Sequence, residues 1–288
     1  MTVGRSSTRR SAAIVLTSVL SLGLVAVGVT VDPDVATAAP GDRLPDLSVK
    51  RPSDLQIQTT SSGRRRLRFT SELVNVGDGP FETRGSRSST SVNTMSISQR
   101  IYTTSGGSRS ISTGVVARYA GDGHDHWHVQ EVARFDLYAI TPGGPSLRRD
   151  AKVGFCFFDT NTYNLGLPGA PSSRQYVESG CGTRLTLSTR NGISVGWLDR
   201  YSWNFAFQWI DVTGLATGDY FLKFTVDPNG RFLEKVEKNN CTWARIRIPA
   251  SGSSVPVRDS GWGCVLPGTP TATPIPRGVV VVPPRPTP

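Results

Sequence analysis

The sequence LRFTSELV at residues 67–74 is followed directly by NVGDGP at residues 75–80. The first stretch, with its Leu, Phe, Thr and Val, is typical of a β-strand, and the Gly/Asp/Pro cluster after it is typical of a turn. Runs of the same kind recur along the chain, at 95–102, 127–140, 152–158, 204–212, 220–227 and 242–248. Because no segment shows a convincing apolar period of 3.6 residues, the sequence predicts an all-β fold.

The pattern of these runs favours an antiparallel β-sandwich. DPNG at residues 227–230 is a strong turn signal between two of the expected strands. Three stretches rich in Ser, Thr and Gly are expected to be long loops, at 83–94, 104–114 and 161–180. Binding and catalytic residues are concentrated on loops that a rigid scaffold positions, so we expect a functional site there.

The composition agrees with this fold class and excludes others. The 288 residues include 30 Gly and 20 Pro, too few for a wholly disordered chain, and they lack the Leu-rich character of a helical bundle. With 32 Lys and Arg against 22 Asp and Glu, the chain carries a net charge of +10, which makes anionic partners such as a cell-wall polymer worth considering. Because the basic residues lack an interleaved pattern of stacking aromatics, nucleic-acid binding is disfavoured.

The first 38 residues have the features of an export signal. Three arginines precede an apolar stretch at 12–29, and ATA at 36–38 supplies the small residues of a signal-peptidase site. We therefore expect a signal peptide at 1–38, cleaved before Ala39, and a secreted, extracellular protein with or without cell-wall association. The alternative is an uncleaved anchor, because the apolar stretch is near the lower length limit for spanning a bilayer.

The rest of the chain divides into one domain and a tail. Residues 39–265 contain all the expected strands and are predicted to form a single domain. Residues 266–288 are rich in Pro, Thr and Val and cannot bury a core, so a disordered tail is expected there.

The cysteine content fits an exported protein. None of the four cysteines belongs to a C-x-x-C pair, which argues against a zinc knuckle. In an oxidising compartment four cysteines indicate two disulfides, with three possible connectivities. We favour Cys156–Cys181 and Cys241–Cys264, because each closes a short local loop.

All three histidines of the chain fall within GHDHWH at residues 123–128. In an extended strand, His124, His126 and His128 would share one face but lie about 6.8 Å apart, too far for one ion unless the segment curls. Three neutral imidazoles with an open position suit Cu(II) or Zn(II), and at equal availability copper binds more tightly. The alternative is an exposed histidine-rich loop with adventitious metal affinity.

The residues around this cluster resemble the lysyl oxidase family. Four segments occur in the same order as in that family: GHDHWH at 123–128 leading into RFDLY at 134–138; KVGFCFFDT at 152–160; GWLDRY at 196–201 with QWIDV at 208–212; and GDYFLK at 218–223, followed by DP at 227–228 and NN at 239–240. The resemblance covers about residues 45–250. It implies a Cu(2+) ion held by the three histidines.

The resemblance also implies an organic cofactor made from the chain itself. In that family a lysine and a tyrosine cross-link into lysine tyrosylquinone, and the matching positions here are Lys152 and Tyr201. The implied activity is a copper-dependent amine oxidase that converts peptidyl lysine or another primary amine to an aldehyde with O2, releasing H2O2 and ammonia. Taken alone, Lys152 would be an ordinary strand-edge charge and Tyr201 one of seven tyrosines.

A catalytic base is needed, and a carboxylate is the natural candidate because every histidine is assigned to the metal. Asp199, two positions before Tyr201, is the first choice, and Glu131 is the second. Asp136 is expected to cap a turn or to orient a ligand histidine. Animal members of the family have a further histidine shortly after the cluster where this chain has Arg134, so no role of that histidine is transferred.

Two other classes of function compete with the oxidase. One is a non-catalytic copper-binding β-sandwich module that binds cell-wall or matrix polymer through the basic run RRRLR at 64–68, although that run also fits a solvated strand end. The other is a zinc hydrolase, which would not need Tyr201. A strongly basic oxidase would also repel amine substrates unless its pocket were locally acidic.

Overall fold

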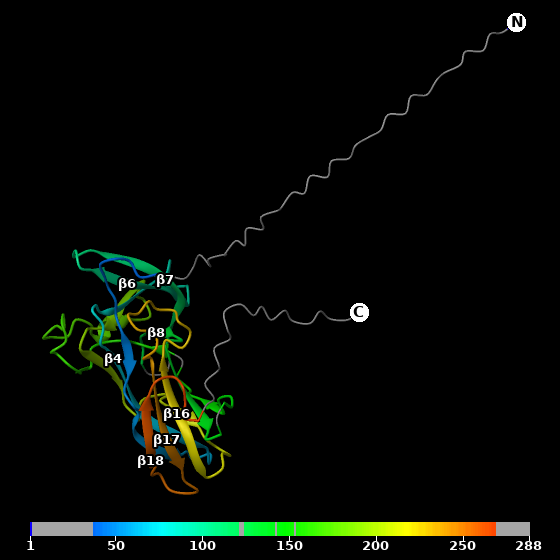
Figure 1. The fold of residues 1–288 in the computed structure, drawn as a ribbon. Coiled ribbons are helices and arrows are strands. Elements are labelled where there is room, and N and C mark those ends of the chain that lie inside the picture. The colour runs from blue at the N-terminus through cyan, green and yellow to red at the C-terminus, as the bar shows by residue number, and fades with distance from the viewer. Residues whose placement is uncertain (2–36, 121–123, 142, 153, 269–288) are drawn as a thin grey trace, which may run out of the picture. The chain divides into compact units, whose positions relative to one another are not determined.

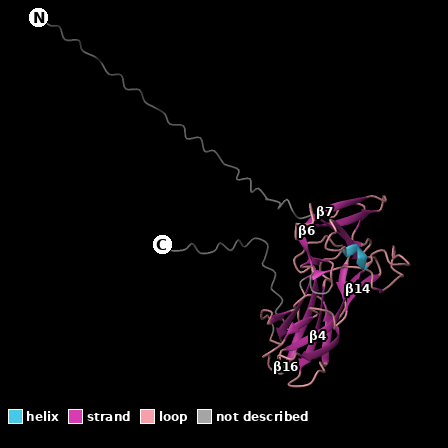
Figure 2. Cartoon of the chain, turned by 180° about the vertical axis from the view of Figure 1, so that it is seen from behind, coloured by secondary structure: helices cyan, strands magenta, loops and turns pink. Residues whose placement is uncertain are grey.

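In the computed structural model of the protein, the long strand that contains the opening stretch, β4 (Arg65–Asn75), pairs with four other strands and is labelled in Figure 1. The structure describes residues 1, 37–120, 124–141, 143–152 and 154–268. The predicted signal peptide therefore lies almost wholly outside the described residues, as does the predicted tail beyond residue 268. Every described pair of strands is antiparallel, which confirms the all-β antiparallel fold (Figure 2).

The strands form three sheets. A seven-stranded sheet has the order β11-β8-β7-β6-β5-β13 with β1 on β6; its strands are β1 (Asp42–Arg43), β5 (Phe81–Ser86), β6 (Thr94–Thr103), β7 (Ser108–Tyr119), β8 (Trp127–Gln130), β11 (Gly154–Phe155) and β13 (Ser188–Ile193). A five-stranded sheet has the order β10 (Arg148–Arg149), β9 (Ala133–Ala139), β16 (Gly218–Val226), β17 (Cys241–Ile248) and β18 (Val257–Trp262).

The third sheet is six-stranded and is built on β4. Its order is β12 (Asn161–Thr162), β14 (Trp197–Tyr201), β4 and β15 (Trp209–Asp211), and β2 (Leu47–Val49) and β3 (Ser53–Thr59) also pair with β4. The one helical element among the described residues is a single 3-10 turn, η1 (Glu178–Cys181). No helix in the described part of the chain is long and apolar enough to cross a membrane.

Buried phenylalanines pack the β4 sheet against the five-stranded sheet. The ring of Phe69 on β4 lies 4.5 Å from that of Phe135 on β9, and Phe135 stacks on Phe224 of β16 at 4.1 Å between centroids. All three side chains are fully buried. Burying each contributes roughly 1.5–3 kcal/mol to folding. Face-to-face packing of two sheets is the arrangement expected of a sandwich.

Several expected element boundaries are wrong. The predicted loop at 104–114 is largely strand β7, and the predicted loop at 83–94 begins inside β5. In β7 the inward positions, Ile111, Thr113, Val115 and Ala117, alternate with exposed or half-buried residues. The strand was not predicted because its outer face is rich in serine.

The expected single strand at 127–140 is instead two strands, β8 and β9. Glu131 between them has a φ of 58°, which is incompatible with a continuous strand. The expected strands at 152–158 and 204–212 are reduced to β11 and β15. The predicted loop at 161–180 is present except for β12 and the start of η1.

Both favoured disulfides are confirmed. Cys156 is bonded to Cys181 and Cys241 to Cys264. The first bridge joins the segment after Lys152 to η1, and the second joins β17 to the segment after β18.

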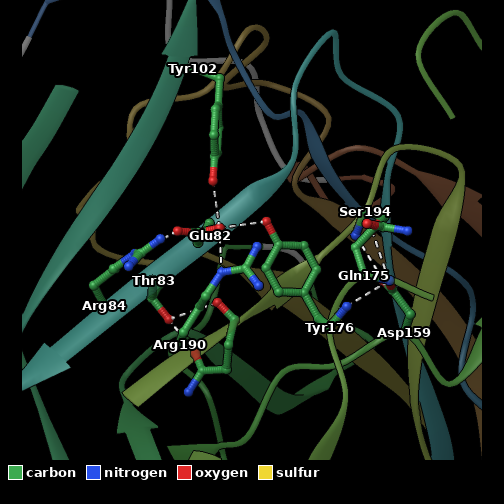
Figure 3. A network of polar contacts seen from close by, with 10 residues as sticks. Glu82, Thr83, Arg84, Tyr102, Asp159, Gln175, Tyr176, Arg190 and Ser194 are labelled. Carbon is green, nitrogen blue, oxygen red and sulfur yellow. Dashed lines mark hydrogen bonds and ion pairs between the residues drawn. The ribbon is translucent and has the colours of Figure 1, made fainter. Parts of the chain in front are cut away.

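A buried carboxylate organises the region between the seven-stranded sheet and the 161–180 loop (Figure 3). Glu82 on β5 accepts hydrogen bonds from the Tyr102 hydroxyl at 2.9 Å and the Tyr176 hydroxyl at 2.8 Å, and from Nε of Arg84 at 2.7 Å and of Arg190 at 3.1 Å. Burial alone would raise the pKa of Glu82. The hydrogen bonds from Arg84, Tyr176 and Tyr102 and the charge of Arg190 outweigh that effect and lower the pKa below its ordinary value.

A second buried carboxylate, Asp159, fixes the backbone of the same loop. It accepts hydrogen bonds from the backbone N–H of Gln175 at 2.9 Å and of Tyr176 at 3.2 Å, and from the N–H and hydroxyl of Ser194, both at 2.8 Å. Tyr176 is thus held at its backbone by Asp159 and at its hydroxyl by Glu82. The chain enters η1 from this fixed point.

Replacing Glu82 with Gln should destabilise the protein by about 2–3 kcal/mol at pH 7, because hydrogen bonds to a buried carboxylate are lost. Folding lowers the pKa of Glu82, so the ionised carboxylate stabilises the folded state fully at a pH above its ordinary pKa of 4.5. This stabilisation is lost as the pH falls through the lower pKa of the folded state. Urea unfolding at pH 7 and at acidic pH measures both effects. The matched control is Asp78→Asn, which removes an exposed ion pair with Lys235 and should cost under about 1 kcal/mol. Equal losses for the two variants would contradict the structural role of Glu82.

Candidate functional site

The three histidines converge where the chain enters β8. His128 lies on β8, whereas His124 and His126 precede it. Their ligand nitrogens all lie within 4.8 Å of one another, and the Nε2 atoms of His126 and His128 are 2.9 Å apart. The turn that brings them together occurs at Asp125, whose φ of 41° curls the backbone.

The donor set fits one divalent cation of the copper or zinc type. Two nitrogens bound at right angles at about 2.0 Å from a metal would lie about 2.8 Å apart, close to the observed His126–His128 separation. Burial, with the nearby charge of Lys152, lowers the pKa of His128 to about 2, so this imidazole is neutral, as a ligand must be. The Nδ1 atom of His126 lies 3.6 Å from a carboxylate oxygen of Glu178, the kind of contact that orients a metal-bound imidazole.

Lys152 and Tyr201 meet in the core beside this cluster. Nζ of Lys152 lies 4.5 Å from the centroid of the Tyr201 ring and 4.9 Å from that of Phe155. Both residues are buried, with exposures of 5% and 6%. The Tyr201 hydroxyl donates a 2.7 Å hydrogen bond to the carbonyl oxygen of Cys156, which fixes the ring relative to the segment that carries Lys152.

Electrostatic effects show that the histidines and the Lys152–Tyr201 pair are neighbours. The charge of Lys152 contributes to the low pKa of His128. The pKa of Tyr201 is raised well above its ordinary value, first by burial and then by the negative charge of Asp199, with a smaller effect from Glu178. Since Glu178 also contacts His126, the site is one cluster rather than two.

Asp199 and Glu131, the candidate bases, have very different surroundings. Asp199 is completely buried, and neither carboxylate oxygen accepts a hydrogen bond from the described residues. Burial raises its pKa well above the ordinary value, although the proximity of Tyr201 and the charge of Lys152 act in the opposite direction. Glu131 is exposed, accepts a 3.1 Å hydrogen bond from the Asn229 amide and lines the same cavity as Lys152.

Two other sequence-based assignments differ from the structure. Asp136 neither caps a turn nor contacts a histidine: it lies within β9 and forms ion pairs with Arg134 at 2.6 Å and Arg149 at 3.2 Å.

The arginines of the basic run at 64–68 make contacts within the chain. Arg66 stacks over the Trp209 ring at 4.2 Å, and Arg68 donates hydrogen bonds to the carbonyl oxygens of residues 203 and 205.

Sequence reasoning missed Glu178 and the aromatic loop after Tyr201. Glu178 stands three positions before Cys181, so the Cys156–Cys181 bridge could have pointed to it. In the loop, the exposed aromatic side chains are Trp203, Phe205 and Phe207, and the ring of Phe205 lies 6.0 Å from that of His124. Alternation of this kind is typical of a strand, so the sequence does not indicate that Phe205 lies beside the histidines.

Comparison with known proteins shows what the central region of the chain is similar to. Residues 118–258 match the family model for lysyl oxidase. Lysyl oxidase homolog 2 of Xenopus laevis is 29% identical over 189 residues, 65% of this chain and 19% of that protein. The chicken (Gallus gallus) homolog 2 is 27% identical over 196 residues, 68% and 20%, and human homolog 3 is 25% identical over 191 residues, 64% and 20%. The chain therefore spans about one fifth of the length of these curated relatives.

Removing a histidine should abolish stoichiometric metal binding. We expect His126→Ala and His128→Ala to weaken Cu(II) binding by at least about 100-fold, because each removes a ligand. Glu178→Gln should weaken it by about tenfold, because it removes only the group that orients His126. Isothermal titration of metal-free protein measures these affinities. The control is Asp125→Asn, an exposed residue within the same segment. Unchanged affinity in both histidine variants would contradict the three-histidine site.

Proposed function

We propose that this chain, whose residues 118–258 belong to the lysyl oxidase family, is a secreted copper-dependent quinoprotein amine oxidase. It would convert a primary amine, such as peptidyl lysine, together with O2 and water into an aldehyde, ammonia and H2O2. The observation that carries the proposal is the position of Lys152 Nζ, 4.5 Å from the Tyr201 ring and beside three clustered histidines. A generic metal-binding module has no need for that buried pair.

The histidines would hold Cu(2+), and the buried lysine and tyrosine would be the precursors of lysine tyrosylquinone. Copper would supply the one-electron and O2 chemistry needed to oxidise the phenol, and the finished quinone an electrophilic carbonyl for a primary amine. The chain's own residues supply position: the Cys156 carbonyl orients the Tyr201 ring, and burial keeps water from the Lys152 amine. Because burial raises the pKa of Tyr201, loss of its proton calls for a nearby cation.

Asp199 is the carboxylate best placed to move a proton at this site. Its buried oxygens have no hydrogen-bond partner among the described residues, and its raised pKa moves it toward the range of a catalytic base. Glu131 is the second candidate because it lines the cavity that reaches Lys152.

Export is supported by the two disulfides, which persist in oxidising compartments, and by the signal-like composition of residues 1–38. The partners we propose are O2 and a primary-amine or peptidyl-lysine substrate, without nucleic acid or a stable membrane partner. Anionic cell-wall polymer is a weaker candidate, because most contacts of the 64–68 run are made within the chain.

The quinone can be tested without knowing the natural amine. Copper-loaded protein kept in air and treated with phenylhydrazine should yield a labelled cross-link between the Lys152 and Tyr201 peptides by mass spectrometry. Lys152→Met and Tyr201→Phe should lose the label while still binding copper, whereas Tyr163→Phe, at an exposed tyrosine, should keep it. Fully metallated protein with both residues unmodified would instead support the non-catalytic copper-binding module.

If Asp199 is the base, its replacement should slow turnover without preventing formation of the quinone. Asp199→Asn should lower kcat for n-butylamine oxidation by about 10²–10⁴-fold, the usual contribution of a general base. The phenylhydrazine label should remain, and Glu131→Gln should stay close to wild type. The measurement is steady-state H2O2 release, normalised to the labelled fraction. If Glu131→Gln shows the large loss and Asp199→Asn does not, the two roles must be exchanged.

A further inference from the structure

Trp127 connects two of the proposed metal ligands, because it stands between His126 and His128 in the sequence. Side chains alternate along a strand, so its ring lies on the face of β8 opposite His128. The ring is 1% exposed and is fixed by three contacts. Its Nε1–H donates to the Thr183 carbonyl oxygen at 2.8 Å, the Tyr119 ring meets it edge-on with centroids 5.8 Å apart, and the guanidinium of Arg87 lies over it, 4.5 Å from its centroid. The contacts that fix this ring therefore also fix the backbone on either side of it.

Arg87, which directly follows β5, is held by hydrogen bonds from all three of its side-chain nitrogens. They donate to four backbone carbonyl oxygens: Nε to Thr186 at 2.9 Å, Nη1 to Thr90 at 3.1 Å and to Val92 at 2.8 Å, and Nη2 to Arg184. A planar guanidinium with this many bonds keeps one orientation, so the cation stays over the indole ring. The stack is a cation–π contact, in which the positive charge is attracted to the face of the ring.

The same hydrogen bonds tie Arg87 to the segment beyond η1. Residues 183–186 follow Cys181, the last residue of η1, and η1 begins with Glu178, the contact of His126. Arg87 thus joins its own loop after β5, the chain after η1, and β8. A metal site keeps its geometry where such neighbours lock the ligand side chains in place. Residue 87 lies outside the region that matches the family model, so the resemblance does not indicate it.

We infer that Arg87 is a positioning residue of the three-histidine site. It acts through Trp127: the stacked and hydrogen-bonded ring fixes the backbone between His126 and His128, and with it the distance between their ligand nitrogens. The inference rests on the proposed copper site of the oxidase, and it adds a residue that is not itself a ligand. Without the guanidinium the ring would keep only its edge contact and one hydrogen bond. The two imidazoles would then take up more than one arrangement and bind a metal ion less tightly.

Wild type is compared with Arg87→Met, Arg87→Lys and Arg66→Met, all prepared free of metal. Methionine keeps an apolar contact with the indole without the charge, whereas lysine keeps the charge without the planar set of hydrogen bonds. Arg66→Met is the matched control, because Arg66 also lies over a tryptophan, Trp209 on β15, at 4.2 Å. Isothermal titration measures the Cu(II) affinity, and electron paramagnetic resonance of the Cu(II)-loaded proteins reports the ligand geometry.

Arg87→Met should weaken Cu(II) binding by at least about tenfold, as loss of an outer contact of a metal ligand usually does, and should broaden or split the copper spectrum. Arg87→Lys should fall between wild type and Arg87→Met. Arg66→Met should keep the wild-type affinity and spectrum. A purely structural role of Arg87 would lower the midpoint of urea unfolding without altering the spectrum. That result, or equal changes in Arg87→Met and Arg66→Met, would overturn the inference.

A measurement on the unaltered protein serves if Arg87→Met does not fold. Because coupling is reciprocal, a metal ion that needs the ordered Trp127 ring must in turn hold that ring in place. Diamagnetic Zn(II) should therefore slow hydrogen exchange of the Trp127 indole N–H, followed by NMR, by at least about tenfold. The control is the Trp197 indole N–H, which donates to the Pro171 carbonyl oxygen at 2.9 Å and should change much less. Equal slowing of both would overturn the inference. Copper-loaded wild type without a phenylhydrazine label would contradict the oxidase but not the role of Arg87.

Discussion

The hydrogen bond from the Tyr201 hydroxyl to the Cys156 carbonyl is the contact on which the site depends. It joins β14 of the β4 sheet to the segment that carries Lys152, so the amine lies over the ring. Cys156 is also bonded to Cys181, which brings η1 and Glu178 to His126. One backbone group thus links the three histidines, the proposed metal ligands, to the Lys152–Tyr201 pair. The Glu82 and Asp159 networks fix the loop that leads to η1 at Tyr176.

The site concentrates buried charge that the rest of the fold must offset. Asp199 is fully buried, and its carboxylate oxygens have no hydrogen-bond partner among the described residues; Lys152 is almost fully buried nearby. Such groups destabilise a folded protein, because burial penalises the charged form. The phenylalanine contacts between the sheets, the two disulfides and the hydrogen-bonded Glu82 supply stability elsewhere. Strain held at a reactive centre and offset by its scaffold is the usual arrangement in enzymes.

Local signals in the sequence predicted much of this structure. Alternation and turn residues gave the strand class, and short loop closure gave both disulfides. The predictions failed where the tertiary structure decides the outcome. Strand β7 was not predicted because its outer face is Ser-rich. The break at Glu131 depends on a positive φ, which the residue types there do not indicate. The Lys152–Tyr201 contact could be expected only from the family resemblance. The contact of Glu178 with His126 joins segments that lie far apart in the sequence, so only the structure shows it.

The part of the chain that matches the family model does not build the site alone. The match begins at residue 118, yet Tyr201 pairs with Ser71 of β4, and Glu82 of β5 holds the loop that leads to η1. Residues 42–117 therefore supply the sheet partners that place the side chains proposed to react, although these residues lie outside the match. The residues proposed to do the chemistry lie in short motifs, whose spacing a family model detects. Their positions depend on β pairing and on buried carboxylates, which many different sequences can provide. We therefore expect the supporting residues to diverge faster than the motifs.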